Sequence, residues 1–281
     1  MADGAISVRS AVSFSWSLWT AKWRAIWGVL ALNSLAGTVA MAGSLASNPT
    51  LLQVGALAAV VFAVMSDGAV FRLALADRHL GDAEFAPGVS GLQWRQTEWR
   101  ILGATVLLAA FVAIVAVLLL IAVGAVVVGL LDSGGLTAIP KTPEAINKAL
   151  GPAGQQVVQA LVLVALGAVT FVVTRLRLAT ACTVDAGKIQ VLSTWRMTRG
   201  HFWRIFGTLI LIIGPSFLVS VLLAGTMLGT GTAPVQMTPG AALLSGLILG
   251  VLSGAMTQPL IAGVLAYYCR HLRTTAAGET T

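Results

Sequence analysis

Polar side chains within the apolar stretches of this chain are the first candidates for chemistry. Asp67 is the one acidic residue clearly inside such a stretch, and Asn33 and Gln258 lie at comparable depth in two others. An ionisable residue in a membrane segment is costly to bury and often marks a proton or cation site. Pro259 leaves a backbone carbonyl without its helical donor, and polar groups beside broken helices line transporter sites. The sequence therefore gives one candidate intramembrane polar site: Asn33, Asp67, Gln258 and Pro259.

The same residues also have a purely structural interpretation. Asp67 precedes Arg72 by five positions, so it can pair with that arginine or with one from another segment. Amide side chains commonly join membrane helices, at about 0.6 kcal/mol per hydrogen bond. We favour this structural interpretation and keep the functional one as the alternative.

Signatures of enzymes and metal sites are missing from the sequence. His79, His201 and His271 are not spaced with carboxylates or cysteines as metal ligands are. Neither a glycine-rich phosphate loop followed by Lys-Ser or Lys-Thr nor a Gly-x-Ser-x-Gly elbow occurs. We expect no catalytic residues, no metal, no cofactor and no enzymatic activity. Cys182 and Cys269 fall at ends of unrelated helices on the expected cytoplasmic side, so we expect two separate thiols.

The composition of the chain indicates which kind of secondary-structure element carries these residues. The chain is 57% hydrophobic and only 10% charged, whereas a soluble domain has roughly 25% charged residues. A membrane helix needs about 20 apolar residues, and six stretches satisfy this length. We expect an all-α polytopic membrane protein with one membrane domain and spans over the following residues: 25–46, 51–76, 101–131, 156–181, 205–229 and 240–269.

The distribution of charge predicts the orientation. Of the 17 Lys and Arg residues, only Lys141 and Lys148 fall in the loops opposite the termini, and all eight Trp fall on the termini's side. The positive-inside rule therefore predicts cytoplasmic N- and C-termini. An alternative is that Lys22, Arg24 and Ala40-Met41-Ala42 belong to a cleaved signal peptide. We disfavour it because the positive region would be too long and too rich in Trp.

Trp-Arg pairs open the odd-numbered spans, at Trp23-Arg24, Trp99-Arg100 and Trp203-Arg204. This likeness predicts an interfacial segment plus a two-helix hairpin, repeated three times; alternatively, any cytoplasmic entry to a membrane helix favours Trp and Arg. The expected parts are an interfacial amphipathic helix (1–23), hairpin 1 (24–76), an interfacial segment with hairpin 2 (87–181), an interfacial helix with hairpin 3 (186–273) and a flexible tail (274–281).

The cationic and indole side chains at the starts of these spans, together with those of the stretch 195–199, form what we call the basic collar. Basic residues at the inner surface attract anionic lipid, so we expect the collar to engage anionic membrane lipid or a protein partner, and not nucleic acid. Its members are Trp23, Arg24, Trp99, Arg100, Trp195, Arg196, Arg199, Trp203 and Arg204.

Three local patterns predict details of packing. Gly246, Gly250 and Gly254 form a small-residue stripe that lets another helix approach closely, within the chain or in a partner subunit. Asp185 can cap a helix that ends near Gly200. Thr142-Pro143 predicts the start of a short capped helix that ends at Gly151.

One family resemblance is carried by the third unit. Arg177-Leu178-Ala179, Val184-Asp185 and the stretch 193–205 resemble the central block of the membrane domain attached to some bacterial glycerophosphoryl diester phosphodiesterases. Related stand-alone six-span proteins resemble it too, and residues 259–273 are similar to the closing block. The resemblance implies a six-helix protein of the bacterial cytoplasmic membrane. The catalytic barrel of those enzymes has no counterpart here, so no catalytic residue is carried over.

The functional expectation is a non-enzymatic accessory or organising protein that works through its basic collar. The first alternative is a transporter of an ion, a small molecule or a lipid, with its site at Asn33, Asp67 and Gln258. A membrane-bound lipid enzyme is the third possibility.

Overall fold

Six helices in the structure are long and apolar enough to cross a membrane. The computed structural model describes residues 7–86, 88–133, 142–228 and 239–278, so the predictions for Lys141 and residues 279–281 lie outside the described residues. Those ranges contain helices and turns but no strand. The prediction of an all-α polytopic membrane protein is confirmed, whereas the threefold repeat stays a prediction.

The spans are formed by the long helices, and short elements connect them. The first five spans are α1 (Val8–Leu45), α2 (Pro49–Leu75), α3 (Gln96–Ser133), α4 (Pro143–Leu176) and α7 (Phe202–Leu228). The sixth comprises α8 (Pro239–Val251), a π-helical turn η4 (Leu252–Thr257) and α9 (Gln258–Gly278). The connecting elements are η1 (Ala76–Arg78), η2 (Ala83–Phe85), η3 (Val89–Gly91), α5 (Leu178–Ala186) and α6 (Ser193–Met197).

Local sequence signals explain several helix boundaries. The Asn48 side chain accepts a hydrogen bond from the Leu51 N–H, and Pro49 occupies the first turn, so α2 begins directly after a tight turn. Thr142 caps α4 in the same way, and Gly151 breaks that helix with φ 61°. The predicted short capped helix between these two residues is therefore confirmed.

The connecting segments differ from the sequence-based expectations. Residues 8–23 are the first part of the continuous helix α1, and α9 continues through the predicted tail as far as Gly278. Before α3, in and next to the predicted interfacial segment that starts at residue 87, the chain forms the single turns η2 and η3. The prediction that Asp185 caps the next helix is wrong, because Asp185 lies in the last turn of α5.

The chain divides into two compact units. One combines Met1–Ala104 with Leu178–Thr281, and the other is Thr105–Arg177. We call them the polar unit and the apolar hairpin. The second is inserted in the first, because the chain leaves the polar unit at Ala104 and returns to it at Leu178.

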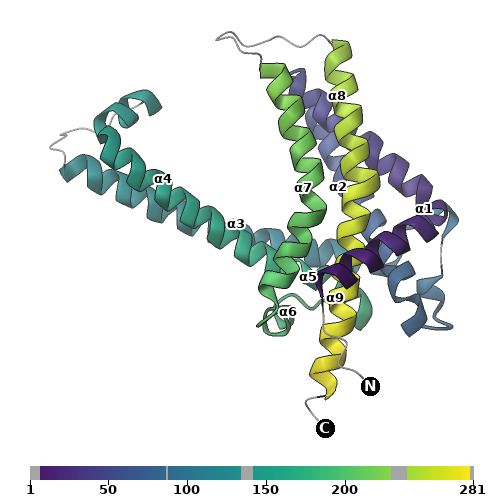
Figure 1. The fold of residues 1–281 in the computed structure, drawn as a ribbon. Coiled ribbons are helices and arrows are strands. Elements are labelled where there is room, and N and C mark those ends of the chain that lie inside the picture. Colours follow the sequence, from purple (N-terminus) through teal and green to yellow (C-terminus); the bar gives the residue numbers. More distant parts are fainter. Residues whose placement is uncertain (1–6, 87, 134–141, 229–238, 279–281) are drawn as a thin grey trace. The chain divides into compact units, whose positions relative to one another are not determined.

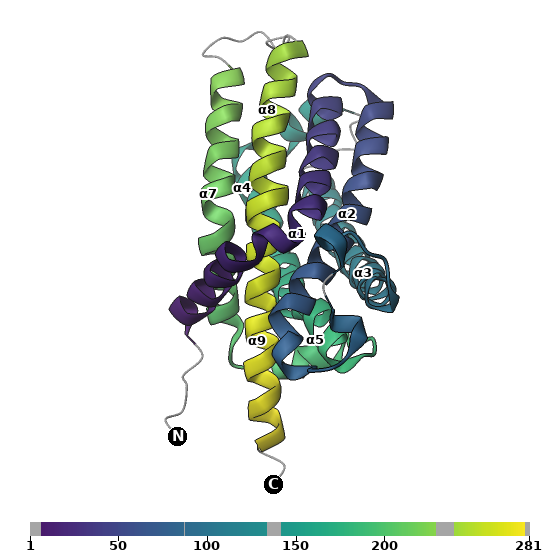
Figure 2. The same cartoon turned by 90° about the vertical axis from the view of Figure 1, so that its right-hand side faces the viewer.

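The core of the polar unit lies among α1, α2, α5 and α9. Phe71, Leu178 and Tyr268 are among its fully buried side chains. The first part of α1 runs obliquely across the bundle and the rest runs beside α8 (Figures 1 and 2). A side chain on Gly250 or Gly254 would collide with Ser34 or its backbone. The glycine stripe therefore makes an internal contact, between the last span and α1.

A disulfide bond joins α5 to α9. Cys182 and Cys269 are both fully buried, and their Cα atoms lie 5.6 Å apart, within the usual range for a bridge. The prediction of two separate thiols is wrong. Sequence spacing gave no sign that the segment after the fourth span packs against the end of the sixth.

The apolar hairpin consists of α3 from Thr105 onward and α4. Its side chains are mostly aliphatic and many are exposed, such as Leu120 at 71% and Leu163 at 68%. Exposed aliphatic surface of this extent suits contact with lipid rather than with water.

Candidate functional site

Three of the four predicted intramembrane residues meet in one hydrogen-bonded cluster. Asn33 Nδ2 donates to Gln258 Oε1 at 2.7 Å, and Gln258 Nε2 donates to Asp67 Oδ1 at 3.3 Å. Gln258 Nε2 also lies 3.1 Å from the Ala63 carbonyl oxygen. The cluster therefore joins α1, α2 and α9 through their own polar groups. We call Asn33, Asp67 and Gln258 the polar cluster.

Pro259 breaks the hydrogen-bond ladder of the sixth span beside this cluster. Proline has no N–H, so the carbonyl of Ala255, four residues earlier, lacks its normal helical donor. Trp19 supplies the missing donor, because its indole Nε1 lies 3.0 Å from the Ala255 oxygen. Asn33 Nδ2 likewise reaches the Gly254 carbonyl at 3.3 Å. Side chains of α1 thus satisfy the backbone that the π-helical turn and the proline disturb.

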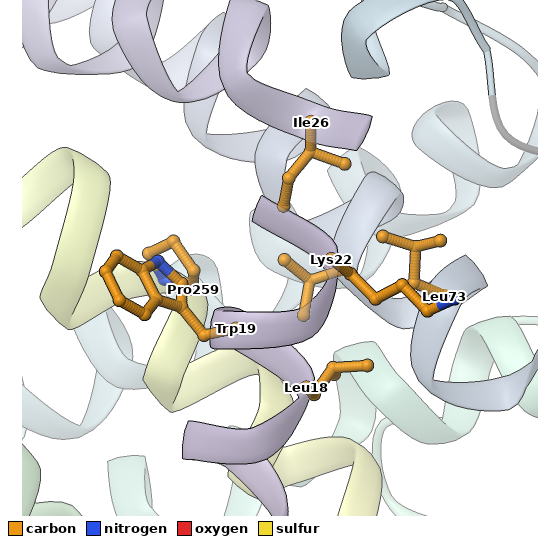
Figure 3. A pocket seen from close by; sticks show the side chains of 7 residues that line it. Leu18, Trp19, Lys22, Ile26, Leu73 and Pro259 are labelled. Atoms are coloured by element: carbon orange, nitrogen blue, oxygen red, sulfur yellow. The ribbon is translucent and has the colours of Figure 1, made fainter. Parts of the chain in front are cut away.

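A narrow pocket of about 10 Å³ borders Pro259. Figure 3 shows Trp19 beside Pro259 and Lys22 extending toward Leu73; Leu18, Ile26 and Val70 complete the lining. A space of this volume holds about one water molecule. It offers no room for an organic substrate.

A buried ion pair that the sequence analysis missed lies between α2 and the start of α3. Arg72 Nη1 donates to Glu98 Oε1, and the two side chains are 1% and 0% exposed. Glu98 Oε2 also accepts the Arg95 N–H at 2.7 Å, so the same carboxylate caps the first turn of α3. Gly68 makes the approach possible, because a Cβ there would lie 2.4 Å from Glu98 Oε1.

Asp185 gathers basic residues from two other segments. Its carboxylate, 3% exposed, lies 3.4 Å from Arg78 Nη1 and 3.3 Å from His79 Nε2, and it accepts a hydrogen bond from Arg273. These contacts join α5 to α9 and to the segment of η1 that follows α2. No sequence pattern pointed to them, because the partners are 106, 107 and 88 positions away.

All residues of the basic collar belong to the polar unit, and most are exposed. Trp99 and Trp203 are 61% and 77% exposed, and Arg100 lies 3.9 Å from Glu84. The Arg24 guanidinium lies 5.8 Å from the centre of the Trp23 ring. An indole held beside a guanidinium is suited to the headgroup layer of a bilayer.

Within the described parts of the chain, no group of three or more His, Cys, Asp or Glu residues could hold a metal ion.

Comparisons with known proteins identify no relative of this chain. No family model, no curated protein and no solved structure matches the chain. The resemblance of residues 177–205 to the membrane domain of glycerophosphoryl diester phosphodiesterases stays a prediction.

Proposed function

We propose that this chain is a non-enzymatic accessory protein of the bacterial cytoplasmic membrane that organises anionic phospholipid around its basic collar. The observation that carries the proposal is the outward exposure of the collar's indole and guanidinium groups, with Trp203 at 77%. Indole side chains anchor in the headgroup layer, and each nearby basic residue contributes about 1 kcal/mol of attraction to an anionic leaflet. The combination favours acidic headgroups over zwitterionic ones.

The arrangement inside the polar unit supports a structural rather than a transporting role. Asn33 and Gln258 bond to each other and to backbone carbonyls, and Gln258 bonds to Asp67. The pocket at Pro259 is too small for a substrate. Polar groups used in this way hold helices together.

The collar's own tryptophans provide the test. Bromine on a lipid chain quenches indole fluorescence on contact, so the protein is reconstituted with brominated phosphatidylglycerol or brominated phosphatidylcholine. The ratio of quenching measures the preference for the anionic lipid. Replacing Arg24, Arg100 and Arg204 together with Gln is expected to lower this preference at least about fivefold.

Lys148→Gln is the matched control, because Lys148 is an exposed cation of the apolar hairpin, outside the collar. It is expected to leave the preference unchanged. An unchanged preference in the triple variant would remove the basis of the proposal.

The proposal also requires the collar to face the cytoplasm. Reporter fusions after Gly278 and near residue 190 are expected to report the cytoplasmic side. A periplasmic signal from either fusion would contradict this orientation.

A second candidate function, transport through the polar cluster, is favoured by one observation. The π-helical turn Leu252–Thr257 directly precedes Gln258, and such turns recur at functional sites. Transport predicts that Asp67→Asn and Gln258→Ala, at wild-type protein levels, fail to complement a deletion strain. Full complementation by both variants would leave transport without a site.

A further inference from the structure

An open hollow of about 370 Å³ lies at the end of the polar unit where α2 and α9 finish. Its lining comes from α1, η1 and α9, through Phe14, Arg78, Arg270 and His271. None of these residues belongs to the basic collar or to the polar cluster. The volume falls within the range of small-molecule sites, roughly 300–1,000 Å³.

Neighbouring carboxylates hold the two guanidinium groups of the hollow in place. Arg270 Nη1 and Nη2 donate to the two carboxylate oxygens of Asp77, at 3.2 and 2.6 Å. Arg78 Nη1 lies 3.4 Å from Asp185 Oδ2. Both arginine side chains remain about one-third exposed, at 30% and 31%. A two-point contact fixes the plane of a guanidinium, so Arg270 is oriented before any ligand arrives.

The charge around the hollow is positive after this pairing. Among the described residues that pair there, three arginines (Arg78, Arg270 and Arg273) face two carboxylates (Asp77 and Asp185), an excess of one positive charge with neutral histidines. The hollow therefore attracts an anion.

His271 adds a polar wall to the hollow, and Phe14 adds an apolar one. His271 Nδ1 lies 2.8 Å from the Tyr267 carbonyl oxygen, which can only accept, so this nitrogen carries a proton. Phe14 belongs to the oblique first part of α1, and its ring centre lies 5.7 Å from that of Tyr267. An anionic group beside an apolar wall is the chemistry of a phospholipid at its headgroup.

We propose that the hollow binds one phosphate-type oxyanion through Arg78 and Arg270, supplied by an anionic phospholipid headgroup or by free phosphate. Guanidinium groups match phosphate oxygens in geometry and remain charged at any physiological pH. This inference rests on the proposed function and deepens it, since it adds one discrete site to the broad lipid contacts of the basic collar.

The experiment is a lipid titration of the full-length protein in mild detergent, followed by native mass spectrometry. Wild-type protein is expected to retain one molecule of phosphatidylglycerol in preference to phosphatidylcholine. Arg270→Gln is expected to weaken that binding about tenfold, as for one lost charge-assisted hydrogen bond. Lys148→Gln removes a positive charge from an exposed position of the apolar hairpin, outside the hollow and the basic collar, and is expected to leave this Kd unchanged.

The Asp77→Asn variant separates loss of the binding site from loss of binding by misfolding. It removes the negative charge that competes for Arg270, so it is expected to strengthen binding, and a gain of affinity does not arise from a damaged fold. Inorganic phosphate is added in a separate arm. Displacement of the bound lipid by phosphate identifies free phosphate as a ligand, whereas resistance to it identifies the lipid headgroup.

The outcomes separate this inference from the proposed function. Equal losses in Arg270→Gln and Lys148→Gln would mean diffuse charge attraction and would overturn the site. Unchanged affinity in both Arg270→Gln and Asp77→Asn would overturn it as well. The collar variant at Arg24, Arg100 and Arg204 is expected to reduce brominated-lipid preference while leaving this single-lipid Kd intact. If the collar variant keeps the wild-type lipid preference, the proposed function fails. If the single-lipid Kd responds to neither Arg270→Gln nor Asp77→Asn, the site alone fails.

Discussion

The polar unit and the apolar hairpin use the same kinds of helix in opposite ways. Half of the most apolar stretch of α1 is buried, whereas none of the corresponding stretch of α3 is. In the polar unit the helices are joined by Asn33, Gln258, the glycine stripe and the Arg72–Glu98 pair. Hydropathy alone is thus sufficient to make a membrane helix, but the choice of its partners depends on small and polar residues.

The largest difference in stability between variants of the two units is expected at the Arg72–Glu98 pair. Glu98→Ala leaves the Arg72 charge buried without a partner, so unfolding in detergent is expected to become easier by about 3–5 kcal/mol. Asp132→Ala, an exposed carboxylate at the end of α3 in the apolar hairpin, is expected to change stability by less than about 0.5 kcal/mol. Similar losses in both variants would mean that Glu98 is not a special contact.

The second-largest loss of stability is expected from removing the indole of Trp19. Trp19→Phe keeps an aromatic ring but leaves the Ala255 carbonyl without its donor, at a cost of about 1–3 kcal/mol. Trp16→Phe is the matched control, because Trp16 is 49% exposed. Thermal unfolding of both variants measures the difference, and equal melting temperatures would refute the role assigned to Trp19.

Glycines of the two units are expected to respond with opposite signs. A Cβ on Gly250 would lie 2.4 Å from Thr38 Oγ1 and 2.7 Å from the Ser34 oxygen, and overpacking of this kind costs about 1–3 kcal/mol. Ala is a better helix former by about 1 kcal/mol, so Gly250→Ala should destabilise by roughly 1 kcal/mol net. Gly124→Ala in α3 meets no atom within 4 Å and should be neutral or stabilising. Stabilisation by both changes would contradict the close contact of α8 with α1.

The smallest effect is expected at the polar cluster. A double-mutant cycle of Asn33→Ala and Gln258→Ala should give a coupling of about 0.6 kcal/mol, with about 1.7 kcal/mol as the upper range for membrane hydrogen bonds. Gln159→Ala, exposed on α4, serves as the control with no coupling to Asn33. A coupling of zero would mean that the Asn33–Gln258 bond contributes nothing to stability.

Much of the fold could be predicted because membrane insertion depends on composition over long stretches. The six spans follow from runs of apolar residues, and Thr142 and Gly151 marked a helix start and a break by local chemistry. Depth along the spans also singled out Asn33, Asp67 and Gln258, which the structure brings together.

Contacts between distant segments could not be predicted from those signals. Glu98 lies just before the apolar run of the third span, and no pattern around it in the sequence indicates a buried partner. Its burial depends on Gly68 and Arg72 of another helix. Asp185 and the two cysteines were misjudged for the same reason, since the partners of all three are far along the chain.

The bridge between Cys182 and Cys269 turns the last third of the protein into a closed covalent ring. The two cysteines are 87 positions apart, and α6, α7 and α8 all lie between them. A protease cut anywhere within that ring would leave the two pieces attached until a reductant is added. The sixth span therefore stays covalently attached to α5 even if the chain is cut between α7 and α8.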